Sequence, residues 1–141
     1  MGIFVHILSS SIVIMDIEKT KQYYSKLTRA DTCSCDYCQN YIDEIRVSYP
    51  AVAEYLMTLG VAIEIPFEVL LPLETVNGYM KYYEVQYLVV GNSDGFKETK
   101  IGNVDIYVTN SHPGATYKGE YFILAAGPFY IKCRTDKYKF E

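Results

Sequence analysis

In the N-terminal part of the chain, apolar residues recur at spacings of three and four, the pattern of helices that bury one face. The first such segment covers residues 16–27, where Ile17, Tyr24 and Leu27 share a face and Asp16 is placed to cap the first turn. Lysines occupy other positions of this segment, so the pattern predicts an amphipathic helix that packs on the rest of the domain.

Two further helices are predicted to follow. The second takes in the cysteines, has Asp31 or Thr32 as its cap and runs to about Tyr49. The third begins at Pro50, whose missing N–H costs nothing in a first turn, and ends at Gly60, which suits a left-handed stop.

After the third helix, the spacing of apolar positions changes to two, which predicts strands. Asn77-Gly78 is a strong hairpin signal, and Gly102-Asn103 marks either a hairpin tip or a bulge. The predicted strands cover residues 67–71, 79–90, 99–109, 121–125 and 129–134. Helices followed by consecutive strands predict an α+β fold, with N-terminal helices packed on one face of a mostly antiparallel sheet of about five strands.

The domain organisation is simple, because a chain of 141 residues without a linker or an internal repeat fits one domain. We predict a single α+β domain over residues 15–141. Residues 1–14 are apolar and alternate like a strand, but they lack the basic start of a signal peptide. We interpret them as an N-terminal extension or an extra strand.

The charge pattern argues against nucleic acid and membrane as partners. The formal net charge is −4, and the basic residues form no stripe that could follow a phosphate backbone. The basic cluster in residues 132–139 is interpreted as a solvated terminus, and Asp43 and Glu44 as a solvated helix face. No apolar run reaches the length of about 18 residues that a membrane span needs, so we expect a cytoplasmic protein.

Tyrosine is the distinctive residue of the composition, with 15 Tyr and 6 Phe but no Trp. A tyrosine ring packs against apolar neighbours, while its hydroxyl needs water or a hydrogen-bond partner. So many tyrosines indicate first a sheet with one solvated face and second a protein-binding surface.

Three of the four cysteines lie in the string C-S-C-D-Y-C that begins at Cys33. This string contains both a C-x-C and a C-x-x-C spacing, and thiolates are ligands that zinc prefers. A structural zinc site needs four ligands, so Cys33, Cys35 and Cys38 require one from elsewhere. Cys133, in the last predicted strand, is the first candidate, and His112, in a loop, is the alternative.

Two other interpretations of the cysteines stay open. Cys35 and Cys38 have the spacing of a thiol–disulfide exchange pair at a helix start, which lowers the pKa of a thiol. Asp36 between them acts against this, because a neighbouring carboxylate raises the pKa of a thiol. Alternatively, the cysteines are small apolar residues that pack a loop beneath the sheet.

Three short motifs of the chain carry a resemblance to a known family: C-x-C-D-Y-C-Q-N-Y over residues 33–41, Leu59-Gly60-Val61 and Pro66-Phe67-Glu68. On these motifs the chain resembles a family of small uncharacterised bacterial proteins with a C-x-C-x-x-C-x-N-aromatic stretch. The resemblance covers roughly residues 15–133 and implies no reaction and no ligand. It implies that the cysteine loop is a shared feature, and it favours an extension for residues 1–14, because members start near the first helix.

These observations leave two functional hypotheses. The favoured one is a non-enzymatic protein-interaction module, stabilised by a structural zinc, that presents a tyrosine-rich face to a protein partner. The alternative is a thiol-redox or metal-dependent enzyme that uses the cysteine cluster, with His112 as base or ligand. The alternative requires an open coordination position or an accessible thiolate beside a pocket.

Overall fold

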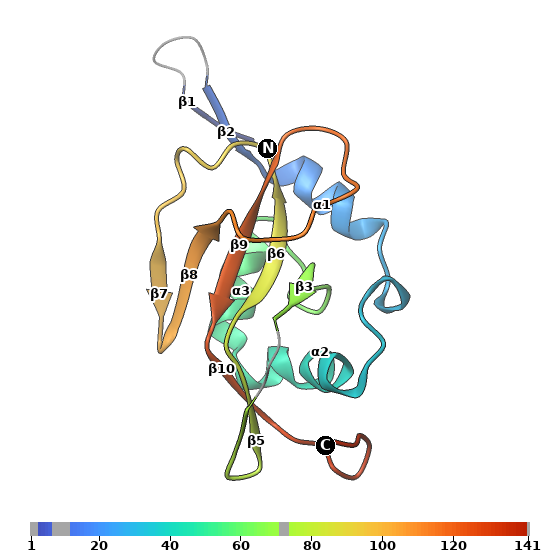
Figure 1. The fold of residues 1–141 in the computed structure, drawn as a ribbon. Coiled ribbons are helices and arrows are strands. Elements are labelled where there is room, and N and C mark those ends of the chain that lie inside the picture. The colour runs from blue at the N-terminus through green and yellow to red at the C-terminus, as the bar shows by residue number, and fades with distance from the viewer. Residues whose placement is uncertain (1–2, 7–11, 71–73, 141) are drawn as a thin grey trace.

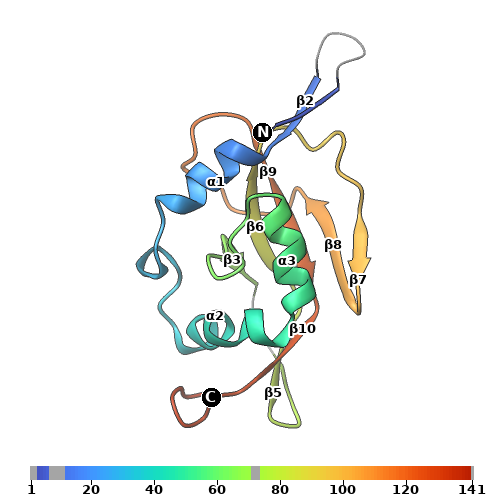
Figure 2. The same cartoon turned by 180° about the vertical axis from the view of Figure 1, so that it is seen from behind.

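The computed structural model describes residues 3–6, 12–70 and 74–140. It contains three α-helices, a five-stranded sheet, a three-stranded sheet and a two-stranded hairpin. In the described part of the chain, all paired strands are antiparallel. The helices lie on one face of the larger sheet (Figures 1 and 2), so the predicted α+β class is confirmed.

Two helices begin where local sequence signals predict. Helix α1 (Ile17–Ser25) begins after Asp16, whose carboxylate accepts the backbone N–H of Lys19 at 2.9 Å. Helix α3 (Pro50–Thr58) starts at its proline and is followed by Gly60, which has a φ of 87°. A Cβ on Gly60 would lie 2.7 Å from the carbonyl oxygen of Ile17, so a glycine there lets the end of α3 approach the start of α1.

The second helix begins later than the sequence indicates. Thr28 and Asp31 form a capping box around a short 3-10 helix, η1 (Arg29–Asp31), so neither Asp31 nor Thr32 caps α2 (Asp36–Ser48). Cys35 is the N-cap of α2 and makes no side-chain capping bond. The first two cysteines therefore lie in a loop, and Cys38 lies in the first turn of the helix.

The larger sheet has the strand order β3-β6-β9-β8-β7, and the smaller sheet has the order β10-β5-β4. The turn at Gly102-Asn103 joins β7 to β8, so it is a hairpin tip and not a bulge. The strands of the two sheets are β3 (Glu68–Val69), β4 (Glu74–Val76), β5 (Tyr79–Tyr82), β6 (Val85–Val90), β7 (Thr99–Ile101), β8 (Val104–Thr109), β9 (Tyr121–Gly127) and β10 (Phe129–Lys132).

The single strand predicted over residues 79–90 is wrong, because the two sheets divide it into β5 and β6. The facing strand divides at the same level, between Gly127 of β9 and Phe129 of β10. Pro128 has no N–H to give to a ladder. A Cβ on Gly127 would lie 2.2 Å from the carbonyl oxygen of Tyr83, so only glycine allows this close approach. The two strands therefore bend together and pass from one sheet to the other.

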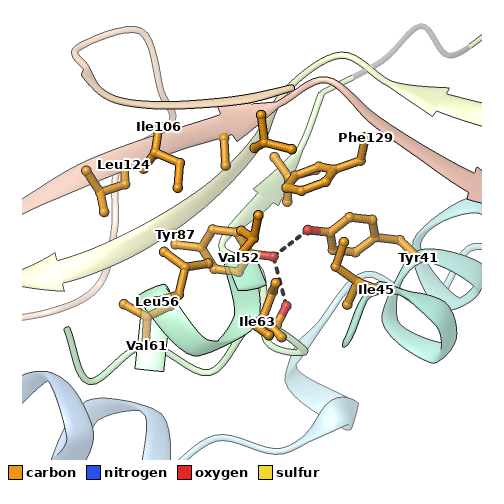
Figure 3. Close-up of a cluster of buried hydrophobic side chains, with 14 of the residues drawn as sticks. Tyr41, Ile45, Val52, Leu56, Val61, Ile63, Tyr87, Ile106, Leu124 and Phe129 are labelled. Carbon is orange, nitrogen blue, oxygen red and sulfur yellow. Dashed lines mark hydrogen bonds between the residues drawn. The ribbon is translucent and has the colours of Figure 1, made fainter. Parts of the chain in front are cut away.

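The main core lies between the helices and the larger sheet (Figure 3). Tyr41 of α2 and Tyr87 of β6 are fully buried, and their hydroxyl oxygens are 2.6 Å apart. Tyr87 donates to the carbonyl oxygen of Ile63 at 2.8 Å, so Tyr41 is the donor to Tyr87. This chain of hydrogen bonds satisfies both hydroxyls and joins a helix, a strand and the loop after α3.

The opposite face of the central strands is covered as well, so the prediction of a sheet with one solvated face is wrong for its centre. All six residues of β6 are buried. Leu88, Val90 and Ile123 form a second cluster that packs against Ala115 and Tyr117 of the connection between β8 and β9. In Figure 1 this connection, drawn in orange, crosses the front of β6 and β9.

Two short strands precede α1. β1 (Ile3–His6) and β2 (Ile12–Asp16) form an antiparallel hairpin, and Met15 makes a single bridge to Gly91 at the end of β6. The assignment of residues 1–14 as an extension or an extra strand, outside a domain over residues 15–141, stays a prediction. In the described part of the chain, no helix is long and apolar enough to cross a membrane.

Candidate metal-binding site

Three cysteine sulfurs converge at the N-terminus of α2. The Sγ atoms of Cys33, Cys35 and Cys38 all lie within 4.8 Å of one another. Zinc with Zn–S bonds of about 2.3 Å in a tetrahedron places its sulfurs about 3.8 Å apart. The sulfurs therefore need to close by no more than about 1 Å to share one ion. They lie close enough to bind a metal ion, and the positive end of the helix dipole favours their negative charge.

Gln39 and Arg29 hold the cysteine loop in place. The side-chain amide of Gln39 donates to the carbonyl oxygen of Cys33 at 2.6 Å and to Oγ1 of Thr32 at 3.3 Å. Arg29 in turn donates to the side-chain oxygen and to the carbonyl oxygen of Gln39. Neither residue is predicted from the sequence, although Gln39 directly follows the last cysteine of the motif.

A cluster of charges fixes Arg29 against α2. Asp43 accepts from Nη1 of Arg29 at 2.7 Å, from Nζ of Lys137 at 2.9 Å and from the hydroxyl of Tyr138 at 2.5 Å. Burial alone would raise the pKa of the Asp43 carboxyl, but hydrogen bonds from Tyr138, Lys137 and Arg29 outweigh it and lower the pKa to about 2. Asp43 therefore stays charged and links the loop to the C-terminal residues.

The C-terminal residues lie along α2, so the prediction of a solvated acidic helix face at Asp43 and Glu44 is wrong, whereas the lysines of residues 132–139 are exposed as predicted. Arg134 pairs with Glu44 at 2.9 Å. The backbone N–H of Lys139 donates to Asp36 at 3.1 Å, beside the cysteines. The side chains of Asp43 and Glu44 are only 12% and 20% exposed. Opposite charges that are distant in sequence meet here, and periodicity within one helix does not reveal this.

Two thiols of the cluster, those of Cys33 and Cys38, differ in their affinity for protons. The backbone N–H of Cys35 donates to the sulfur of Cys33, and this bond, with others from the thiols of Cys38 and Cys35, outweighs burial and lowers the pKa of Cys33. Burial raises the pKa of the Cys38 thiol, and its hydrogen bonds to the other two sulfurs raise it further. Cys33, which is exposed, thus becomes a thiolate more readily than Cys38. A metal needs all three thiolates, so its binding releases protons.

Cys133, the first candidate for a fourth ligand, lies outside the converging group. It is buried in the core, and burial raises the pKa of its thiol. Its backbone N–H donates to the carbonyl oxygen of Gly78 at 2.9 Å. Asn40 of α2 binds the chain on both sides of Cys133, at Lys132 and at Arg134, at 3.0 Å each. These backbone bonds fix the position of Cys133.

His112, the alternative fourth ligand, also lies outside the group. It lies on the connection between β8 and β9, where its Nδ1 is 2.8 Å from the carbonyl oxygen of Pro113. Its ring lies between those of Phe67 and Tyr121, with both pairs of ring centroids 6.4 Å apart. The converging group thus includes neither Cys133 nor His112, and the assignment of either residue as the fourth ligand stays a prediction.

A pocket of about 210 Å³ opens beside the sulfurs. Of its acidic residues, Asp31 accepts from the backbone N–H of Thr28, whereas the side-chain carboxylate of Glu68, on β3, makes no hydrogen bond or ion pair with the described residues. Glu68 lies near enough to Cys33 that its charge acts to raise the pKa of that thiol. The pocket is lined by Asp31, Thr32, Cys33, Cys38, Pro66, Phe67, Glu68 and Val69.

No protein-family model, no curated protein and no solved structure matches this chain. The resemblance to the bacterial family with the C-x-C-x-x-C-x-N-aromatic stretch therefore stays a prediction. The geometry of the cysteine loop and its pocket is the basis on which a function is inferred.

Proposed function

We propose that this domain binds one zinc ion through the thiolates of Cys33, Cys35 and Cys38 and acts as a protein-interaction module. The observation that supports the zinc is the convergence of three sulfurs within 4.8 Å. Zinc there would join the loop before α2 to the first turn of the helix and so contribute directly to folding. Four free cysteines suit a reducing compartment such as the cytoplasm.

Metal content tests the zinc proposal. Protein purified without chelator is expected to contain about one zinc per chain, measured by plasma mass spectrometry. Cys35→Ser and Cys38→Ser are expected to lose the metal, whereas Cys133→Ala, the matched control outside the group, is expected to keep it. A metal-free wild type that also fails to take up added zinc would overturn the proposal, as would full zinc content in Cys38→Ser.

The smaller sheet provides the surface that we propose for a partner. Tyr79, Tyr83 and Tyr130 are exposed by 46%, 46% and 40%. The ammonium group of Lys81 lies 4.4 Å from the ring centroid of Tyr83 and 5.7 Å from that of Tyr130. Lys81 and Tyr130 are cross-strand neighbours, and Tyr79 and Tyr83 are each two residues from Lys81, so these four residues, the tyrosine face, share one side of the smaller sheet. Exposed tyrosines around a lysine suit a protein surface that carries carboxylates and aromatic rings.

Quantitative affinity capture tests the tyrosine face. The double variant Tyr83→Ser/Tyr130→Ser is compared with Val47→Ser/Met57→Ser, which removes exposed apolar side chains from the helices instead. Specific partners are expected to be lost from the first variant and kept by the second. Equal capture by both variants would remove the tyrosine face from the proposal.

A second candidate function is thiol–disulfide exchange, which the exposed Cys33 thiol with its lowered pKa favours. The Cys33 thiolate would attack a disulfide substrate, and Cys35 would then displace the bound half. The substrate thus gains the two electrons that the cysteine pair loses. Metal-free protein equilibrated in glutathione buffers is expected to show a Cys33–Cys35 disulfide with a defined midpoint. Persistently reduced thiols in oxidised glutathione would exclude this candidate.

A further inference from the structure

Three sulfurs leave one position of a tetrahedral zinc without a ligand from the converging group. Cys133 is held in the core by its backbone and by Asn40, and the ring of His112 is held between Phe67 and Tyr121. Zinc sites with three protein ligands keep the fourth position for water or for a ligand from outside.

The pocket beside the sulfurs supplies the space for such a ligand. Cys33 and Cys38 form one side of it, and Pro66, Phe67 and Glu68 form another. Phe67 offers an aromatic wall to a planar group. The Glu68 carboxylate, free of partners within the described residues, is available to accept a hydrogen bond from a ligand seated there.

The charge of the pocket selects against anions. Three thiolates exceed the charge of one Zn²⁺ by one, Asp31 and Glu68 add further negative charge, and none of the described residues that line the pocket is basic. An anionic ligand is repelled by these groups. A neutral donor that also carries an N–H is favoured, because it coordinates zinc without added charge and donates to a carboxylate.

Resting on the proposed zinc site, we propose that an imidazole from outside this chain fills the fourth position and donates its second ring N–H to Glu68. Imidazole has both features, since one ring nitrogen coordinates while the other donates. Imidazoles bound to metals in proteins almost always donate their other N–H to a carboxylate, a carbonyl or water, which fixes the ring. Three cysteines and one imidazole also form a common zinc ligand set.

The pocket also has room for whatever carries the imidazole. A second pocket, of about 310 Å³, shares Asp31, Pro66 and Phe67 with the first, so the two adjoin. It continues toward Tyr23 of α1 and Gly114 of the β8–β9 connection. Free imidazole fits the first pocket alone, whereas a histidine in a peptide would use both.

The experiment uses the whole chain loaded with Co²⁺, whose visible absorption reports its ligands. Imidazole and N-methylimidazole are titrated in parallel, because both coordinate but only imidazole keeps an N–H. Azide supplies the anionic probe, and N-acetylhistidine amide supplies the peptide-like one. Each titration is repeated with Glu68→Ala and with Glu54→Ala, a matched control on the exposed side of α3. Cobalt content is measured after each titration to show that the metal stays bound.

The expected result is saturable binding of imidazole, about 3- to 10-fold tighter than that of N-methylimidazole, as one hydrogen bond predicts. Glu68→Ala is expected to abolish this ratio, and Glu54→Ala to keep it. Tighter binding of the histidine amide would identify a peptide source, and equal or weaker binding a small molecule. Binding of azide in preference to imidazole, or no response of bound cobalt to imidazole, would overturn the inference. Absence of the sulfur-to-cobalt charge-transfer band would instead overturn the zinc proposal itself.

Discussion

Helix α2 contributes to two regions, the core and the cysteine loop, which differ in how the chain itself satisfies their polar atoms. Tyr41, one turn after Cys38, lies in a core where its hydroxyl donates to Tyr87, and Tyr87 donates to a backbone carbonyl. In the cysteine loop, the three sulfurs lie close to one another, the backbone N–H of Cys35 donates to the sulfur of Cys33, and Cys33 and Cys38 line a pocket. The polar atoms of the core are satisfied by the chain itself, whereas the sulfurs of the loop lie close enough together to bind a metal ion.

This difference has an energetic consequence. A buried polar group that keeps its partner adds little net stability, but one that loses its partner costs much. In the described part of the chain, Oε1 of Gln86 is the buried side-chain N or O atom without a hydrogen-bond partner, so nearly all buried polar side-chain atoms of the core are hydrogen-bonded. We therefore expect the contribution of core residues to the free energy of unfolding to be the same with and without metal, and that of the cysteine loop to depend on metal.

The largest effect is expected from a cavity in the core. Phe129 is fully buried, with its ring centroid 5.7 Å from that of Tyr41 and 5.0 Å from that of Tyr49. Phe129→Ala is expected to lower the free energy of unfolding by about 3–5 kcal/mol, with or without zinc. Urea denaturation measures this, with the exposed neighbour Tyr130→Ala as control at about 0.5 kcal/mol or less. A zinc-dependent loss in Phe129→Ala would contradict the separation of the two regions.

The elements predicted correctly depend on local chemistry. Asp16 caps α1 because its side chain reaches an N–H three residues away, and Asn77-Gly78 joins β4 to β5 as a hairpin. The division of residues 79–90 was missed because its cause lies on another strand. Gly127 must approach Tyr83 closely, and no signal within residues 79–90 shows this. Short-range signals therefore locate elements, while their assignment to sheets depends on distant partners.

The candidate site follows the same rule. The spacing of Cys33, Cys35 and Cys38 was sufficient to predict that their sulfurs lie together. Arg29 and Glu68 were missed, because their contacts with the loop depend on the path of η1 and on the position of β3. A motif thus identifies ligands that are close in sequence, and the structure is needed for the groups that support them.

Zinc is expected to produce the next largest effect. At a free concentration about 100 times Kd, zinc stabilises a protein that binds it only when folded by about 2.7 kcal/mol. Thermal unfolding with and without zinc is expected to show this increment in the wild type and in Cys133→Ala. Cys35→Ser is expected to lose it while it keeps the stability of the metal-free wild type. An equal increment in Cys35→Ser would show that zinc acts elsewhere.

A smaller effect is expected when the hydrogen-bond chain of the core is broken. Tyr87→Phe leaves the hydroxyl of Tyr41 and the carbonyl oxygen of Ile63 without their partner, which is expected to cost about 1–3 kcal/mol. The zinc increment is expected to be unchanged. Tyr117→Phe, on a half-buried ring of the β8–β9 connection, is the control and is expected to cost about 0.5 kcal/mol or less. A variant whose zinc affinity falls with its stability would show that the two regions are coupled.

The smallest effect is expected at Asp43, where the ion pairs that support the cysteine loop depend on pH. The folded-state pKa of Asp43 is about 2, below the value of about 3.9 expected for the unfolded chain. Its contribution is therefore complete above about pH 4 and is lost as the pH falls through about 2. Asp43→Asn is expected to lose about 1 kcal/mol at neutral pH. Because the carboxylate of the wild type is protonated in acid, the free energies of unfolding of the wild type and Asp43→Asn are expected to become equal near pH 2.

Urea unfolding across this pH range measures the difference between the two proteins, with Asp94→Asn as a control that follows the wild type. A constant difference at every pH would mean that the charge of Asp43 does not support the loop.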